Sequence, residues 1–165
     1  VAGKRESRRL MGDVVLTQND ILRQVAYEDA SVTTSWTIDL HYPDPKNTRF
    51  FPGDEFKAVC NQEEIELYPI PYRCFYSRNV SNLFMAGRNI SVTHVALGTV
   101  RVMRTTAMMG EVVGMAAAVC RRHDVLPRTV YTSYLPELRS LMQKGCGQQD
   151  LPNNQQFNIG RRKHH

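Results

Sequence analysis

The chain has 165 residues, of which 42% are hydrophobic and 22% charged, and its formal net charge is +5. This composition is typical of one modest globular domain with a hydrophobic core. No apolar run approaches the roughly 18 residues that a membrane-spanning helix needs, so a spanning segment is excluded. The positive charge suits an anionic partner, which could be a nucleotide cofactor, an acidic metabolite or nucleic acid.

The two ends of the sequence carry little information about function. No signal peptide opens the chain, and its first residues are typical of the middle of a protein, so we expect the natural start to lie upstream and predict no compartment. The four cysteines show no CxxC motif and no metal-ligand spacing, which predicts no metal site. Cys120 lies in an apolar run and is expected to be a small buried residue.

The first half of the chain predicts mainly strands. An apolar stretch at 10–16 indicates a strand or a strand pair, and Thr17 or Asn19 could cap a short helix over 20–26. Residues 32–42 are β-branched and aromatic, with alternating apolar positions, which predicts one strand. A proline-rich loop follows.

The second half predicts a short strand and then helices. Residues 64–77 contain Pro69 and Pro71, so a strand there is an edge strand or is interrupted. Residues 83–86 are typical of a buried strand, and Pro136 opens a predicted last helix within 135–142. The polar tail at 145–165 is expected to be extended or loosely held.

The strongest predicted element is a helix over roughly 99–122, whose segment 107–119 is apolar apart from Glu111. We therefore expect that segment to be buried on most sides. The helix has small residues on one face, which allows close approach to a sheet or helix: Ala107, Gly110, Gly114 and Ala118. A tightly packed core helix without any ligand would explain the same pattern.

The turn before this helix has features of a ligand site. Gly87 lets a ligand or a backbone come close, and Gly98 can form a tight turn. Unpaired N–H groups from Thr99 to Val102 would then carry partial positive charge at the helix start. An anionic or electron-rich ligand atom is stabilised in such a place.

Two segments, GKRESRRLMGDVVLTQNDI at 3–21 and NLFMAGRNISVTHVALGTVRVMRTTAMMGEVVGMAAAV at 82–119, resemble the C-terminal region of the FAD-dependent oxidoreductase family with a glutathione-reductase-like flavin domain. The resemblance implies FAD as cofactor and a small organic substrate. It also implies that the residues after the Ala86-Gly87 pair line the FAD chain and that the helix start approaches the flavin ring. The cofactor-binding residues expected from it are Gly87, Arg88, Asn89, Ile90, Ser91, Gly98, Thr99, Val100 and Arg101.

The sequence departs from the family pattern at two points. Related flavoproteins often have an acidic residue after the Ala-Gly pair, whereas Arg88 stands here and could meet a phosphate instead. No GxGxxG follows a strand, because Gly110 and Gly114 lie inside the predicted helix. We therefore expect the adenine and pyrophosphate half of the site to come from an N-terminal portion of the parent protein.

A few polar residues are weaker candidates for chemistry. His94 could move protons near a flavin or could be a structural histidine. Arg5 and Arg8 could hold a substrate carboxylate, or could be solvated or paired with Glu6. Arg101 and Arg104 lie in the first turns of the predicted helix, where cations oppose the helix dipole, which favours a functional or ion-paired role; Arg101 is the second catalytic candidate. Asp39 and His41 share one strand face, as an acid/base pair or as plain polar residues.

Together these features predict an α+β fragment. Strands at 1–78 would belong to a substrate-side domain, 79–144 would supply the final strand and long helix of an α/β FAD-binding domain, and 145–165 would form a tail. The predicted function is hydride or electron transfer between FAD and an organic substrate by the full-length parent, the fragment alone being inactive. The alternative is a non-enzymatic basic module that binds nucleotides or nucleic acid. Nucleic acid is disfavoured because no recognised motif is present.

Overall fold

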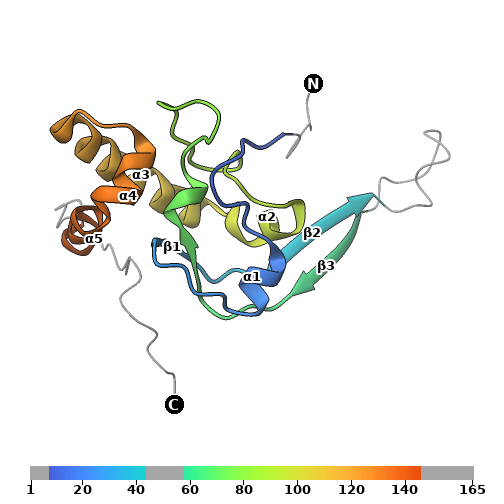
Figure 1. The fold of residues 1–165 in the computed structure, drawn as a ribbon. Coiled ribbons are helices and arrows are strands. Elements are labelled where there is room, and N and C mark those ends of the chain that lie inside the picture. Colours follow the sequence, from blue (N-terminus) through green and yellow to red (C-terminus); the bar gives the residue numbers. More distant parts are fainter. Residues whose placement is uncertain (1–7, 44–57, 146–165) are drawn as a thin grey trace, which may run out of the picture.

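The fold is mixed α+β, and a computed structural model describes it for residues 8–43 and 58–145. Small antiparallel strand pairs lie at the centre and to one side, and three helices gather on the opposite side (Figure 1). No helix within the described residues has both the length and the apolar character that crossing a membrane requires. The elements are α1 (Gln18–Leu22), β1 (Ala30–Thr34), β2 (Ile38–Pro43), β3 (Ala58–Glu63), β4 (Tyr68–Pro71), the 3-10 helix η2 (Tyr72–Cys74), α2 (His94–Val100), α3 (Met103–His123), α4 (Pro127–Ser133) and α5 (Leu135–Lys144).

Local capping signals were predicted correctly. Thr17 is the N-cap of α1 and exchanges hydrogen bonds with Asp20, whose amide donates to Thr17 Oγ1 at 3.2 Å and whose carboxylate accepts from the Thr17 amide at 2.8 Å. This reciprocal capping box starts the helix at Gln18, two residues before the predicted start. Helix α5 has Pro136 in its first turn and confirms the predicted last helix. The expected tail lies outside the described residues.

The single strand predicted at 32–42 is wrong, because the structure divides it into β1 and β2. β1 pairs with β4, whereas β2 pairs with β3 in a separate two-stranded sheet. Residues 35–37 connect the two strands without belonging to either, and Trp36 in this connection is 54% exposed. Among the described residues β4 pairs with β1 alone, which agrees with an edge strand that tolerates Pro69 and Pro71.

The two predicted strands at 10–16 and 83–86 are also wrong. Each takes part in only one isolated bridge among the described residues, Leu16 with Val92 and Tyr76 with Phe84. Leu16 and Met85 are nevertheless fully buried. The apolar runs therefore correctly indicate residues that are buried in the core, but these residues do not form a continuous strand.

The long helix predicted from residue 99 is two helices, α2 and α3. The helix is interrupted at Arg101 and Val102, where the backbone of Val102 is extended with φ −70° and ψ 147°. α2 begins at His94, where Thr93 Oγ1 accepts a hydrogen bond from the Ala96 amide. Gly98 and Thr99 thus lie inside α2, and the predicted turn before the helix does not exist.

Only one side of α3 is buried, so the expected burial on most sides is wrong. The small residues Ala107, Gly110, Gly114 and Ala118 are exposed. Within the described part of the chain, nothing lies within 4 Å of a Cβ built on Gly110 or Gly114. The small-residue face therefore makes no close packing contact here.

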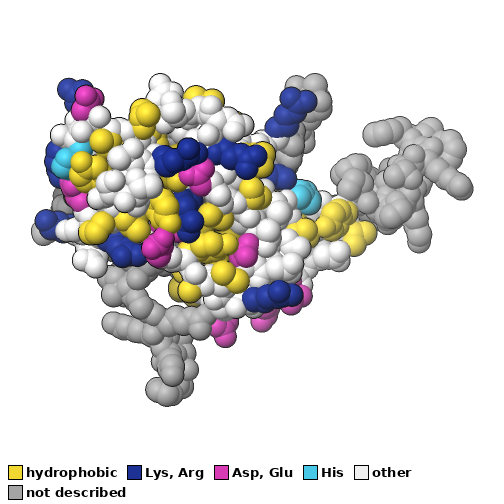
Figure 2. All heavy atoms as spheres, viewed as in Figure 1, with side chains coloured by type: hydrophobic (Ala, Val, Ile, Leu, Met, Phe, Trp, Pro, Cys, Tyr) yellow, Lys and Arg dark blue, Asp and Glu magenta, His cyan; other side chains and the backbone are white. Residues whose placement is uncertain are grey.

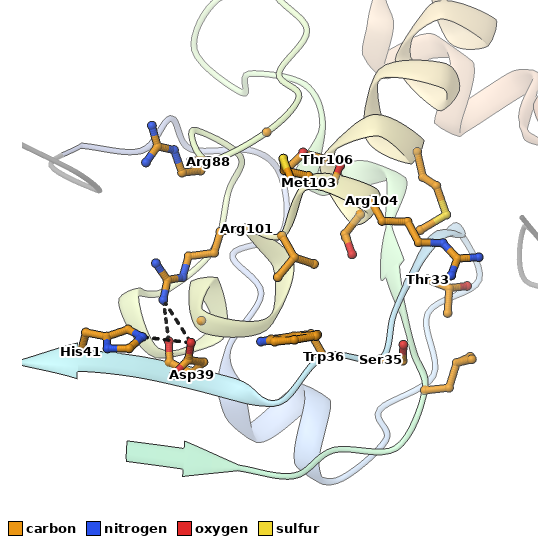
Figure 3. A pocket seen from close by; sticks show the side chains of 16 residues that line it. Thr33, Ser35, Trp36, Asp39, His41, Arg88, Arg101, Met103, Arg104 and Thr106 are labelled. Atoms are coloured by element: carbon orange, nitrogen blue, oxygen red, sulfur yellow. Dashed lines mark hydrogen bonds and ion pairs between the residues drawn. The ribbon is translucent and has the colours of Figure 1, made fainter. Parts of the chain in front are cut away.

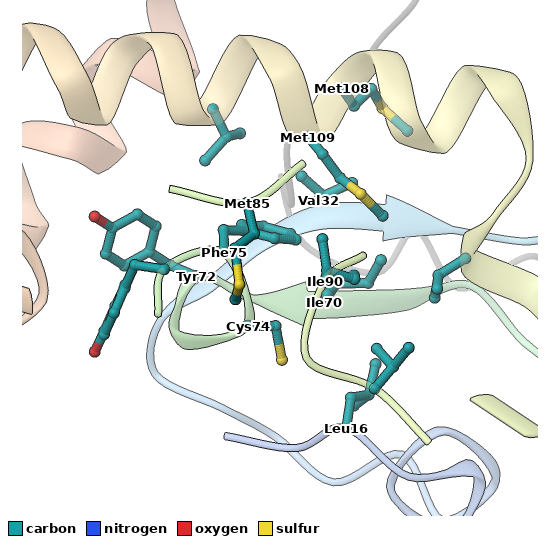
Figure 4. Packing of buried hydrophobic residues seen from close by; sticks show 14 of the residues in the cluster. Leu16, Val32, Ile70, Tyr72, Cys74, Phe75, Met85, Ile90, Met108 and Met109 are labelled. Atoms are coloured by element: carbon teal, nitrogen blue, oxygen red, sulfur yellow. The ribbon is translucent and has the colours of Figure 1, made fainter. Parts of the chain in front are cut away.

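The opposite side of α3 faces the main core. There Met109 and Met108 pack with Val32 of β1 and with buried residues from the segments around β4 and η2 (Figure 4). α4 and α5 pack against α3 near its C-terminal end. The start of α4 is tied to η2, because the Tyr72 hydroxyl donates a hydrogen bond to the Pro127 carbonyl at 2.9 Å. Cys120 is only partly buried against this core.

Candidate functional site

A cavity of about 1100 Å³ lies where β1, β2 and the beginning of α3 meet (Figure 3). Its volume is slightly above the range of about 300–1,000 Å³ that is typical of small-molecule and cofactor sites. Basic side chains lie beside hydrophobic ones near the middle of the face shown in Figure 2. The cavity is lined by Thr33, Ser35, Trp36, Asp39, His41, Leu67, Gly87, Arg88, Gly98, Arg101, Val102, Met103, Arg104, Thr105, Thr106 and Met108.

One wall of the cavity is the N-terminus of α3. The first helical hydrogen bond runs from the Thr106 amide to the Val102 carbonyl at 3.0 Å, so the amides of residues 103–105 precede it. Val102, the N-cap residue, provides no side-chain cap. In a helix of 21 residues this end carries partial positive charge, which favours an anionic or electron-rich ligand atom.

A second wall is the backbone at Gly87 and Arg88. Gly87 has φ +95°, a left-handed conformation that favours glycine. A Cβ at Gly87 would meet no described atom within 4 Å, so the space beside the backbone is open. Arg88 is exposed and lies at the rim of the cavity, where its side chain points outward (Figure 3).

The third wall comes from the break between β1 and β2 and from β2 itself. Trp36 projects from the break, and Arg101 extends from the α2–α3 junction toward Asp39 (Figure 3). Arg101 Nη2 donates to the Asp39 carbonyl at 2.9 Å and lies 3.8 Å from Asp39 Oδ2. The carboxylate thus offsets the charge that this arginine places near a helix start.

Asp39 is also the centre of a polar cluster on β2 and β3. Its carboxylate contacts His41 Nε2 at 3.0 Å and accepts hydrogen bonds from Cys60 Sγ at 3.2 Å and Gln62 Nε2 at 3.5 Å. Burial acts to raise the pKa of Asp39, but the hydrogen bonds from Cys60, His41 and Gln62 outweigh it and hold that pKa below its ordinary value. The hydrogen bond to Asp39 raises the pKa of the Cys60 thiol.

The structure brings four of the predicted site residues to the cavity, namely Gly87, Arg88, Gly98 and Arg101. Gly98 also has a packing role, because a Cβ added at this position would lie 2.9 Å from the Asp39 amide nitrogen. Asp39 and His41, the weaker candidates on β2, and Arg104 also line the cavity, whereas the remaining predicted residues do not. Asn89, His94 and Arg8 are exposed elsewhere, Ile90, Ser91, Thr99 and Val100 are buried, and Arg5 lies outside the described residues.

Sequence reasoning missed the start of α3 at residues 103–106 and the contribution of Trp36. The apolar periodicity of the helices runs across their junction and hides the break. Trp36, the only tryptophan in the chain, fits the apolar alternation of the predicted strand at 32–42, and this alternation hides its place in the cavity. Thr99, by contrast, is held in the interior, where its hydroxyl lies 2.9 Å from that of Thr34.

Comparison with known proteins identifies the family of this chain. The chain matches the model of the FAD dependent oxidoreductase family over residues 1–142, and it therefore belongs to that family. FAD is the cofactor that this membership implies. No curated protein and no solved structure gave a significant match.

The residues that line the cavity fit part of an FAD molecule. The open space beside Gly87 admits a chain that passes close to the backbone, and the exposed Arg88 can meet a phosphate. The helix end at residues 103–105 suits an electron-rich ring edge. The sequence has no Gly-rich strand–turn–helix motif for the dinucleotide, so these residues fit the flavin end of the cofactor.

Proposed function

We propose that this chain is the C-terminal part of an FAD-dependent oxidoreductase in which the flavin end of FAD occupies the cavity between β1, β2 and α3. The observation that carries the proposal is the convergence of Gly87, Arg88 and the start of α3 on one cavity. A cavity that favours an anionic group would also suit the alternative of a basic nucleotide- or nucleic-acid-binding module, and the family match is what favours FAD chemistry over it.

Each wall has a distinct task in this proposal. Gly87 and Arg88 hold the chain of FAD, while the amides of Met103 to Thr105 stabilise negative charge at the ring edge. Bound FAD supplies an acceptor for a hydride or electron pair from an organic substrate. Trp36 and the polar face of β2 border the substrate side, and Arg101 keeps Asp39 in place.

The proposal retains the division into a substrate-side segment at 1–78 and an FAD-domain segment at 79–144. The adenine and pyrophosphate half of the site would come from a segment that precedes this sequence in the parent protein. A strand followed by GxGxxG in that segment is the expected partner.

A matched pair of glycine variants in the full-length protein tests the cofactor site. Gly87 and Gly145 both have positive φ, at +95° and +67°, and neither has a described atom within 4 Å of a built Cβ. Alanine at either position therefore takes a positive-φ backbone conformation that residues with a side chain rarely adopt. Of these two glycines, Gly87 lines the cavity and Gly145 does not.

We expect Gly87→Ala to weaken FAD binding by at least about tenfold, equivalent to about 1.4 kcal/mol, and Gly145→Ala to leave it unchanged. FAD dissociation constants from titration of the apoprotein measure this directly. Equal FAD affinity in the two variants would show that the backbone at Gly87 does not approach the cofactor.

A further inference from the structure

We infer that Asp39, His41 and Cys60 form a binding site for a zinc-type divalent metal ion at the edge of the cavity. Strand pairing creates this cluster. His41 and Cys60 are direct partners in the antiparallel β2–β3 register, and Asp39 lies two residues from His41 on the same strand face. The inference does not depend on the proposed flavin site.

The donor atoms are close enough to share one ion. His41 Nε2 lies 3.0 Å from Asp39 Oδ2, Cys60 Sγ lies 3.2 Å from Asp39 Oδ1, and one ligand atom from each residue falls within 4.8 Å of the others. Tetrahedral zinc, with bonds of about 2.0–2.3 Å, separates its donors by about 3.3–3.8 Å. Small side-chain rotations would reach that spacing.

The chemistry of the donors favours zinc over a hard cation. A carboxylate oxygen, an imidazole nitrogen and a thiolate sulfur together suit a borderline-soft ion, whereas Mg²⁺ and Ca²⁺ prefer oxygen ligands alone. The cysteine spacing in the sequence gave no indication of this site, because the ligands come from two strands and meet only through their pairing.

Three protein ligands leave one tetrahedral position for an oxygen ligand. Asp39 and His41 both line the cavity, which places that position toward the same space. The ligand class would be water or the hydroxyl or carboxylate oxygen of a substrate.

Arg101 makes a distinguishing electrostatic prediction. Its guanidinium lies 3.8 Å from Asp39 Oδ2 and so opposes a cation bound there. Removing this charge should strengthen metal binding several-fold. Removing a ligand should weaken binding by more than about 100-fold, beyond the effect expected for an outer-sphere partner.

Calorimetric titration of the full-length protein with Zn²⁺ tests the inference. We expect one equivalent to bind, with binding lost in Cys60→Ser and His41→Gln, retained in His94→Gln and strengthened in Arg101→Met. His94 is a suitable control because its ring lies near that of Tyr42 on β2, but it is not a member of the cluster. Substitution with Co²⁺ should give the visible bands of a tetrahedral thiolate site.

A second measurement avoids variants that fail to fold. Cys60 is exposed, whereas Cys74 is buried, so alkylation of the wild-type protein followed by peptide mapping reports on Cys60. Zn²⁺ should slow alkylation of Cys60 at least tenfold. Unchanged alkylation in millimolar Zn²⁺, or Zn²⁺ binding that survives the loss of Cys60 and of His41, would overturn the inference.

Discussion

The contact between α2 and β2 predicts that Gly98 tolerates no side chain. An alanine Cβ there would lie 2.9 Å from the Asp39 nitrogen, 3.0 Å from the Asp39 oxygen and 3.2 Å from Ile38 Cγ2. Two of these neighbours are backbone atoms, which cannot rotate away. Overpacking of this kind costs about 1–3 kcal/mol.

Gly114 provides the matched control, because it is also helical and its Cβ would meet no described atom within 4 Å. Alanine improves the helix propensity at either position by about 1 kcal/mol, so the comparison cancels that gain. We expect Gly98→Ala to have a free energy of unfolding about 1–3 kcal/mol lower than that of Gly114→Ala. Urea unfolding followed by circular dichroism measures both. Variants of equal stability would refute the close α2–β2 packing.

Further predictions concern buried charge. The Asp29 side chain is fully buried and accepts three hydrogen bonds of 2.8–2.9 Å from Arg73, so Asp29→Ala should lower the free energy of unfolding by about 3–5 kcal/mol. Arg128→Ala, which removes an exposed ion pair with Asp13, should have little effect in the same urea experiment, and similar losses in both variants would contradict this account. Burial raises the pKa of Glu111 above its ordinary value of 4.5, so Glu111 favours the folded state below that pH and loses this contribution as the pH rises through its folded pKa. Glu111→Gln should therefore be more stable than wild type at pH 7 but not at pH 4, and an equal change in melting temperature at both pH values would count against it.

Features set by neighbouring residues could be predicted from the sequence. The capping role of Thr17, the start of the last helix near Pro136 and the edge position of β4 all depend on a few adjacent residues. Each follows from local hydrogen bonding or from the missing amide of proline. The long FAD-family segment at 82–119 also identified the family, because the order and spacing of its residues are specific.

Features set by distant partners could not be predicted. The alternation at 32–42 is continuous in the sequence, but β1 and β2 pair with different strands, and nothing in the segment itself specifies this. The break at Val102 is hidden for the same reason, since apolar periodicity continues on both sides of it. The contact between His41 and Cys60 depends on the β2–β3 register across 19 positions of sequence.

The break at Val102 also changes which residues can serve an anionic ligand. With α2 beginning at His94, the amides of Thr99 and Val100 are inside a helix. The amides that precede the first hydrogen bond of α3 belong to residues 103–105, which line the cavity. Arg104 lies in that first turn, is exposed and lines the cavity. A cation beside the positive end of a helix is unfavourable by itself. An anionic group in the cavity, however, would be stabilised both by the charge of Arg104 and by the N-terminus of α3. We therefore expect the phosphate or ring edge of FAD to lie against Arg104 and the α3 start, about one helical turn beyond the position that the sequence predicted.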